Sequence, residues 1–233
     1  MPLNAFGQTI GEPVPGWAAR PLPPRTQMEG RFCRVVPLNA ALHAPELHDA
    51  FAGASPASWT YLPDYMGPHT TLAAWREWLE SARAANDPLW HTIVDAESGR
   101  ASGVGCYLRI DAAVGSIEVG GLLFSPSLQK TPAATEAMYL MMRRAFDELG
   151  YRRYEWKCDA FNAPSRAAAL RLGFTFEGIF RQHMVYRGRA RDSAWFSILD
   201  TEWPGLKPAF EAWLRPGNFD GEGRQKKGLA DFR

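Results

Sequence analysis

One stretch, from Gly115 to Phe174, constrains the fold of this chain more than any other. It predicts an apolar strand that ends at Ser125-Pro126, a polar connector of small residues, and a helix that begins near Pro132. A second strand and a short Ala-rich helix follow, and Gly173 suits the end of that helix. The start of the first helix offers free N–H groups and a positive dipole end. It therefore predicts a site for an anionic group such as a diphosphate.

Two adjacent glycines, Gly120 and Gly121, interrupt the first of these strands. Glycines inside a strand are typical of a β-bulge or of a close approach by another backbone or a ligand. A bulge here predicts that the main chain of Leu122, Leu123 and Phe124 is available to a ligand. A bent core strand without any ligand is the other interpretation of the same pattern.

Periodicity and turn residues predict a mixed α+β domain around this stretch. We expect an extended Pro-rich arm over residues 1–29, a single domain over 30–215 and a mobile, Gly-rich tail over 216–233. The expected strands are 31–38, 89–95, 101–110, 115–124, 154–160, 174–186 and 191–199, of which the second to fourth form an antiparallel meander. The expected helices follow Asn39 and Thr71, cover 132–149, follow Asn162 and cover 206–214.

Composition argues against several classes of protein. The 26 basic and 25 acidic residues leave a net charge of +1, which gives no basic face for nucleic acid or anionic lipid. Cys33, Cys106 and Cys158 lie at unrelated spacings in apolar stretches, so we expect buried free thiols, no disulfide and no metal site. No apolar stretch approaches the roughly 20 residues of a membrane span, and residues 1–15 do not read as a signal peptide. We expect a cytoplasmic protein that binds no membrane.

The pattern resembles the acetyl-CoA-binding core of the GNAT N-acetyltransferases, in the subgroup that resembles the ribosomal-protein N-terminal acetyltransferases. The resemblance covers roughly a quarter of the chain, and its pieces are specific only in combination. It implies a mostly antiparallel twisted sheet of about seven strands, splayed at a coenzyme A cleft and flanked by helices. The matching residues are Ile117–Gly120, Gln129, Thr131, Ala134, Thr135–Ala137, Asn162–Ser165, Leu172–Phe174 and Glu177–Gly178.

The resemblance also implies acetyl-CoA as co-substrate. In the family the phosphate loop reads Gln/Arg-x-x-Gly-x-Gly/Ala, whereas Pro132 holds the fourth position here and has no N–H to give. Asn162 corresponds to a residue that bonds the pantetheine arm, and it can cap a helix at the same time. The expected co-substrate residues are Leu122, Leu123, Phe124, Gln129, Lys130, Thr131, Ala133, Ala134, Thr135, Asn162 and Ser165.

Acetyl transfer to an amine requires a proton acceptor, since amine pKa values of ~8 to ~10.4 leave most of the amine protonated at neutral pH. Glu118, at an acidic position of the resembling subgroup, is the expected base, and Asp159 is the weaker candidate. An ion-paired or solvated strand glutamate is the structural alternative for Glu118. Many family members carry a tyrosine seven residues after the motif asparagine to protonate the sulfur, but Ala169 stands here. Either the thiolate leaves unassisted or Ser165 supplies the proton.

The resulting hypothesis is an N-acetyltransferase that acts on a primary amine by direct attack in a ternary complex. The alternative is a non-catalytic acyl-CoA-binding or regulatory protein on a degenerate GNAT fold, because Pro132 and Ala169 depart from the family pattern. Trp59 and Tyr61 either line the acceptor pocket or cover the core.

The sequence leaves the partners of the chain open. The acceptor is either a small molecule or a protein N-terminus, because acceptor loops vary freely on a shared scaffold. The Pro-rich arm and the C-terminal helix, with Trp203 and Trp213, are the candidate contacts of a homodimer.

Overall fold

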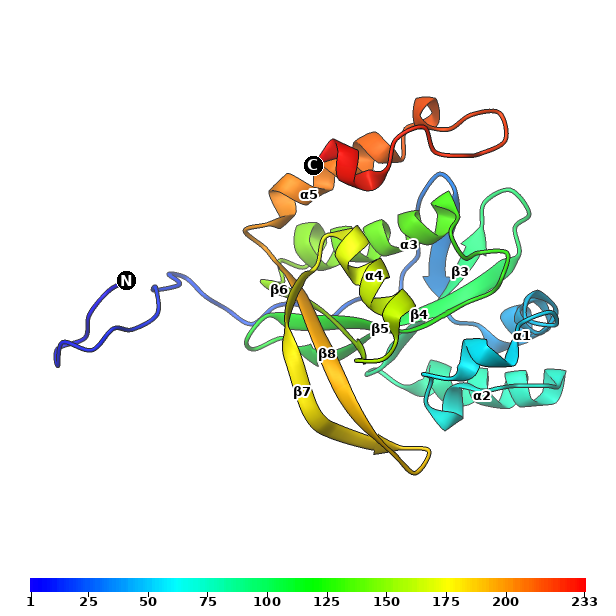
Figure 1. Cartoon of the computed structure of the whole chain (residues 1–233), viewed down its shortest axis with the longest axis horizontal. Coiled ribbons are helices and arrows are strands. Elements are labelled where there is room, and N and C mark those ends of the chain that lie inside the picture. Colours follow the sequence, from blue (N-terminus) through cyan, green and yellow to red (C-terminus); the bar gives the residue numbers. More distant parts are fainter.

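The computed structural model describes all 233 residues and places eight strands in one twisted sheet (Figure 1). The strands are β1 (Met28–Glu29), β2 (Cys33–Pro37), β3 (Leu89–Asp95), β4 (Ala101–Asp111), β5 (Ser116–Phe124), β6 (Arg153–Asp159), β7 (Thr175–Tyr186) and β8 (Arg189–Leu199). The helices are α1 (Ala40–Ala50), α2 (Leu72–Ala84), α3 (Pro132–Arg143), α4 (Ala163–Leu172) and α5 (Trp203–Trp213). A π-helical turn, Arg144–Glu148, continues α3.

The strand order is β1-β2-β3-β4-β5-β6-β8-β7, and β5 and β6 are the only parallel neighbours. The predicted fold class, a mixed protein with a mostly antiparallel sheet, is confirmed. The sheet has one strand more than the expected seven or so, because the two-residue strand β1 pairs with β2. The predicted meander corresponds to β3, β4 and β5.

Side chains at the predicted helix starts explain where the helices begin. Asn39, Thr71, Thr131 and Asn162 each accept a hydrogen bond from a backbone N–H in the first turn of α1, α2, α3 and α4. These caps satisfy donors that a helix start leaves free. Gly173 ends α4 in the left-handed region, at φ 100°.

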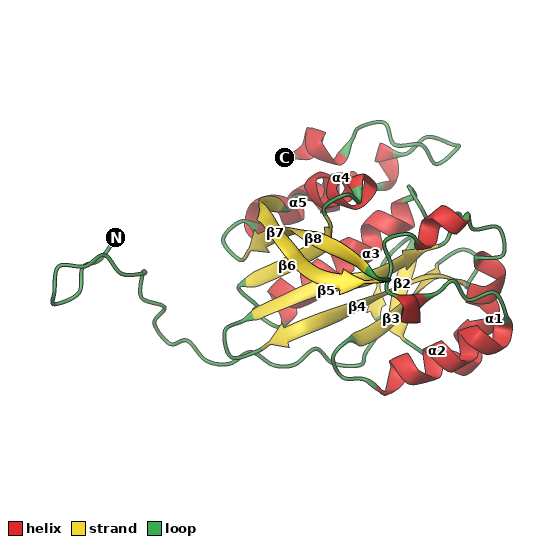
Figure 2. Cartoon of the chain, turned by 60° about the horizontal axis from the view of Figure 1, so that its bottom comes forward, coloured by secondary structure: helices red, strands yellow, loops and turns green.

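Helices cover both faces of the sheet (Figure 2). Apolar side chains are buried on each face. Helices α3 and α5 contribute to a core with Ile117 and Val119 of β5, while α1 and α2 form a second core with Trp90 of β3. Successive side chains of a strand point to opposite faces. Glu118, between Ile117 and Val119, therefore faces away from α3. None of the helices combines the length and apolar character that a membrane span requires.

Residues 1–27 carry no helix or strand beyond an isolated bridge between Leu3 and Thr9. Figure 1 shows their first part running away from the sheet. The arm meets the domain at Trp17, whose indole nitrogen donates to the carbonyl of Ala113 (2.9 Å).

Residues 216–233 differ from the mobile tail that their composition predicts. Leu229 is 2% exposed and belongs to the main core. The buried side chain of Asn218 donates to the carbonyls of Trp213 and Lys227, which fixes both ends of the segment. Whether this segment packs on the domain depends on a few apolar residues that enter the core. Its overall composition does not reveal them.

Trp203 and Trp213, the candidate dimer contacts of the C-terminal helix, are buried within the chain. Trp203 and Trp213 are 4% and 2% exposed. The Trp203 ring stacks on Phe146 and Tyr139, with ring centroids 5.2 and 6.1 Å apart. These two side chains therefore pack within the chain's own core, and a homodimer that uses the arm and this helix stays a prediction.

Candidate active site

The sheet opens between its two parallel strands. Pairing of β5 with β6 runs from Ser116 opposite Arg153 to Val119 opposite Trp156 and stops there. Strand β5 continues to Phe124 without a partner on this side. Apart from the carbonyl of Phe124, which accepts from Gln129, this edge has no partner and can meet a ligand, as the resemblance implied.

A bulge on β5 accompanies the opening. The pairing register with β4 shifts between Gly120 and Leu123, which confirms the expected bulge. Gly121 lies in it at φ 58°, and a Cβ there would come within 2.4 Å of the Trp90 ring. Only glycine meets both conditions, so the paired glycines turn the strand where it leaves β6.

A pocket of about 880 Å³ lies beside the unpaired end of β5. Three cationic residues, Lys130, Arg171 and Arg224, are in its lining, and no Asp or Glu is. Because the whole chain carries a net charge of only +1, this positive character is local. The volume is that of a small-molecule site, ~300–1,000 Å³. The expected co-substrate residues in its wall are Leu122, Leu123, Phe124, Gln129, Lys130, Thr131, Ala134, Thr135, Asn162 and Ser165.

Two backbone N–H groups are free around the start of α3, and one of them, that of Lys130, belongs to a residue of the pocket lining. The backbone N–H groups of Lys130 and Ala133 make no hydrogen bond within the chain. Lys130 adopts φ 62°, and Pro132 occupies the first turn of the helix. Free N–H groups at a helix start suit a diphosphate. Ala133 is not part of this pocket's lining: its side chain packs in the main core, and the residue borders the second pocket described below.

The side chain of Gln129 makes a hydrogen bond within the chain that stabilises the phosphate loop. Its Nε2 donates to the carbonyl oxygen of Phe124 (2.9 Å), which links the phosphate loop to the end of β5. The family pattern alone did not reveal this contact.

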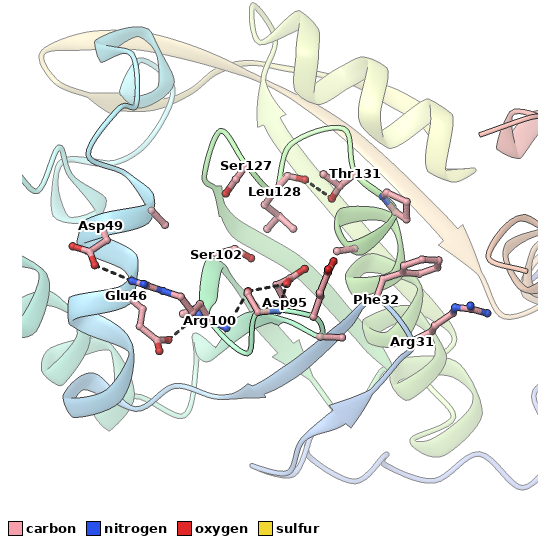
Figure 3. Close-up of a pocket in the computed structure, with 17 residues that line it drawn as sticks. Arg31, Phe32, Glu46, Asp49, Asp95, Arg100, Ser102, Ser127, Leu128 and Thr131 are labelled. Atoms are coloured by element: carbon pink, nitrogen blue, oxygen red, sulfur yellow. Dashed lines mark hydrogen bonds and ion pairs between the residues drawn. The ribbon is translucent and has the colours of Figure 1, made fainter. Parts of the chain in front are cut away.

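The same loop also borders a second pocket of about 810 Å³ (Figure 3). Four carboxylates line it, those of Glu46, Asp49, Asp95 and Glu97. Arg100 pairs with Asp49 at 2.8 Å, as Figure 3 shows. An excess of carboxylates disfavours a polyanion, so electrostatics favour the first pocket for coenzyme A.

The start of α4 presents two further polar groups to the first pocket. The Oδ1 atom of Asn162 accepts from the N–H of Ser165 (3.1 Å), while its amide nitrogen donates to no group of the chain. The Ser165 hydroxyl accepts from the indole nitrogen of Trp156 (3.0 Å), which leaves the hydroxyl proton free to be donated. Capping and ligand binding by Asn162 are thus compatible.

Glu118 lies outside the pocket lining, on the opposite face of the sheet. It is 3% exposed, and burial raises its pKa against the opposing effect of two cations. Its Oε2 accepts from Arg109 Nη1 (2.8 Å) and pairs with Lys157 Nζ (2.9 Å). Its Oε1 accepts no hydrogen bond from the chain. The ion-paired alternative is therefore realised at one oxygen, and the other is available.

Comparison with known proteins identifies the family. A model of the acetyltransferase (GNAT) domain matches residues 34–175. The chain belongs to the GNAT family. A crystal structure of a GCN5-related N-acetyltransferase from Brucella melitensis is 49% identical, with a TM-score of 0.90, and the match covers 94% of this chain and 99% of that one.

Two further relatives are more distant. The uncharacterized N-acetyltransferase YnaD of Bacillus subtilis is 28% identical over 83 residues, 36% of this chain and 49% of that protein, so the chain spans about half the length of this curated relative. The microcin C7 self-immunity acetyltransferase MccE, solved with acetyl-CoA and AMP, shares the fold. Its TM-score is 0.65 at 20% identity, over 76% of this chain and 98% of that one.

The other residues singled out in the sequence of this GNAT protein lie in different surroundings. Trp59 is 6% exposed and packs in the second core, so it covers the core. Tyr61 lines the pocket, and its hydroxyl donates to the carbonyl of Phe161 (3.1 Å). The carboxylate of Asp159 accepts from the N–H of Phe161 (2.8 Å) and the hydroxyl of Tyr186 (3.0 Å).

Sequence reasoning missed the cations that hold Glu118. Lys157 is 5% exposed at its side chain, pairs also with Glu155 (2.7 Å) and lies 3.6 Å from the centre of the Trp195 ring. The alternation of β6 was the available signal, because Trp156 and Cys158 point to the α3 core and Lys157 must point the other way. No sequence signal placed it beside Glu118.

Proposed function

We propose that this chain is an acetyl-CoA-dependent N-acetyltransferase that acetylates a primary amine by direct attack in a ternary complex. The single observation that carries the proposal is the unpaired end of β5 beside a pocket with three cationic residues and no carboxylate in its lining. The presence of acetyl-CoA in the MccE structure supports the choice of co-substrate. When bound, acetyl-CoA supplies a thioester carbonyl that an amine can attack.

The residues around the pocket divide the work of binding. The free N–H group of Lys130 and the start of α3 receive the diphosphate, and the main chain of β5 from Leu122 to Phe124 receives the pantetheine arm. The amide nitrogen of Asn162 holds that arm from the other side. Correct placement of both reactants can supply ~7–11 kcal/mol of the barrier reduction.

Two side chains handle protons in the proposed reaction. Glu118, with Oε1 unbonded, takes the proton of the acceptor ammonium directly or through water. Arg109 and Lys157 fix the carboxylate through its other oxygen. The hydroxyl of Ser165 relays a proton, giving one to the departing sulfur and taking up the one that the attacking nitrogen loses, since Ala169 stands where other members have tyrosine.

Glu118→Gln is expected to lower turnover about 100-fold, the order of magnitude of general-base catalysis. The loss should be greatest at low pH, where free amine is scarcest. Affinity for coenzyme A should change little, because Glu118 lies outside the pocket. The measurement is the pH profile of kcat from pH 6 to 9.

Glu155→Gln is the matched control. Glu155 lies on β6 opposite Glu118 of β5 and also pairs with Lys157. It should retain most activity if the effect belongs to the base and not to the ion network. An unchanged rate of Glu118→Gln at every pH would remove Glu118 from the mechanism.

Asn162→Ser is expected to weaken coenzyme A binding about tenfold, the equivalent of one lost hydrogen bond of ~1–1.5 kcal/mol. Serine still caps the helix, so the free energy of unfolding should stay nearly constant. Calorimetric titration with coenzyme A gives the affinity, and Asn39→Ser, at the cap of α1 outside the pocket, is the control. Equal affinities of the parent and Asn162→Ser would show that Asn162 caps the helix and does not bind coenzyme A.

The proposed function is tested by thiol release from acetyl-CoA with a panel of acceptors: polyamines, aminoglycosides and short peptides with free N-termini. Release that depends on the amine, with a matching acetylated product, supports the transferase. Saturable binding of acetyl-CoA without release for any amine would instead favour the non-catalytic acyl-CoA-binding protein.

A further inference from the structure

The C-terminal segment forms one wall of the coenzyme A pocket. Trp213, Phe219, Gly223, Arg224 and Gln225 line it together with the start of α3 and with α4. This wall lies outside residues 34–175, which the family model matches. Figure 1 shows the segment, in red, beside α3 and α4.

The wall is a short turn with fixed ends. Phe219 and Gln225 form an antiparallel bridge, and the turn 220–224 lies between them. The Gln225 side chain accepts from the indole nitrogen of Trp213 (3.0 Å), which joins the turn to α5. The turn is therefore held against the pocket by specific contacts.

The turn carries charges of both signs, but only its positive residue lines the pocket. Asp220 and Glu222 pair with Arg224, at 3.0 Å each, yet of these three only Arg224 is part of the lining. Arg171, at the end of α4, has no carboxylate partner and donates to the hydroxyl of Thr135 (3.1 Å). Arg233 adds a second positive charge beside Arg171, since its guanidinium donates to the Arg171 carbonyl. This end of the pocket lacks a counter-anion for Arg171.

The two ends of α4 give the direction of the ligand. Asn162 lines the pocket at the start of α4, and Arg171 lies nine residues, about 14 Å, further along the helix at 1.5 Å per residue. In coenzyme A the diphosphate separates the pantetheine arm from a 3′-phosphorylated adenosine. With the diphosphate on the start of α3, the adenosine must lie toward Arg171 and the turn.

We infer that the turn 219–225 and Arg171 recognise the nucleotide end of coenzyme A. This inference rests on the proposed function. Arg171 and Arg224 bind the 3′-phosphate, and the half-buried ring of Phe219 packs on the adenine. Guanidinium groups suit phosphate, and aromatic rings offer a face to a base.

Calorimetric titration of the full chain with coenzyme A and with 3′-dephospho-coenzyme A tests the inference. The parent should bind coenzyme A at least about tenfold more tightly, as expected for a charge-assisted phosphate contact. Arg224→Gln should reduce this ratio severalfold by weakening coenzyme A alone. Arg171→Gln should reduce it further, and Phe219→Ala should weaken both ligands equally.

Two additional variants separate recognition from stability. Replacement of 220–224 by Asn-Gly keeps a two-residue hairpin between Phe219 and Gln225 and should remove the contribution of Arg224 without unfolding the chain. Arg215→Gln, an exposed arginine outside the pocket lining, is the matched control and should change neither affinity.

An affinity ratio near one for the parent, or a ratio that Arg224→Gln, Arg171→Gln and the shortened turn all leave unchanged, would overturn the inference alone. Failure of the parent to bind either ligand would overturn the proposed function together with it. The two failures are thus distinguishable.

Discussion

Ala134→Asp is expected to weaken coenzyme A binding by at least about 100-fold and to leave the fold intact. Ala134 is half-buried in the first turn of α3 and lines the pocket. A carboxylate there would face the diphosphate, and two unit charges about 4 Å apart repel by ~4 kcal/mol at an effective dielectric constant of 20. The same carboxylate favours a helix start, so stability should be kept or slightly raised.

Calorimetry with coenzyme A and urea unfolding measure the two effects of Ala134→Asp separately. Ala73→Asp, at an exposed position in the first turn of α2, makes the same change away from the pocket and should leave affinity untouched. Parent-like coenzyme A affinity in Ala134→Asp would mean that the diphosphate lies elsewhere.

The contribution of His91 to the free energy of unfolding is expected to fall by roughly 3 kcal/mol between pH 7 and pH 4. The side chain is 1% exposed in β3, and neither ring nitrogen has a hydrogen-bond partner. Burial, assisted by the charge of Arg144, lowers its pKa from 6.5 to about 4. The unfolded chain therefore takes up the proton first. The stabilisation that neutral His91 contributes is fully present above pH 6.5. It decreases as the pH is lowered, until the pKa of the folded state is reached.

The difference between parent and His91→Leu isolates this effect, because carboxylates elsewhere titrate equally in both. Urea unfolding at pH 7, 5.5 and 4 should show a shallower decline in His91→Leu. His48→Leu, at a more exposed histidine of α1, should decline like the parent. Parallel curves for His91→Leu and the parent would show that His91 does not control acid stability.

Local sequence signals predicted the elements of the fold well. Asn39 and Asn162 cap helices where expected, and Gly120 and Gly121 coincide with the bulge, because each of these features depends on the residue and its near neighbours. The strand that carries this bulge also lines the pocket, so the place of the proposed co-substrate site follows from the same stretch.

Long-range contacts were beyond the same reasoning. Arg109 and Lys157 reach Glu118 from two other strands, and nothing local in the sequence pairs them with it. Arg224 joins the pocket only because Leu229 and Asn218 anchor a segment whose composition is that of a loose tail. Tertiary packing of a few residues determined each of these outcomes.

A crystal structure with coenzyme A bound tests the central claim most directly. We expect the pantetheine arm along Leu122 to Phe124 in the gap between β5 and β6, and the diphosphate at Lys130 and the start of α3. Coenzyme A bound in the carboxylate-lined pocket of Figure 3, or a gap closed by side chains in the complex, would contradict it.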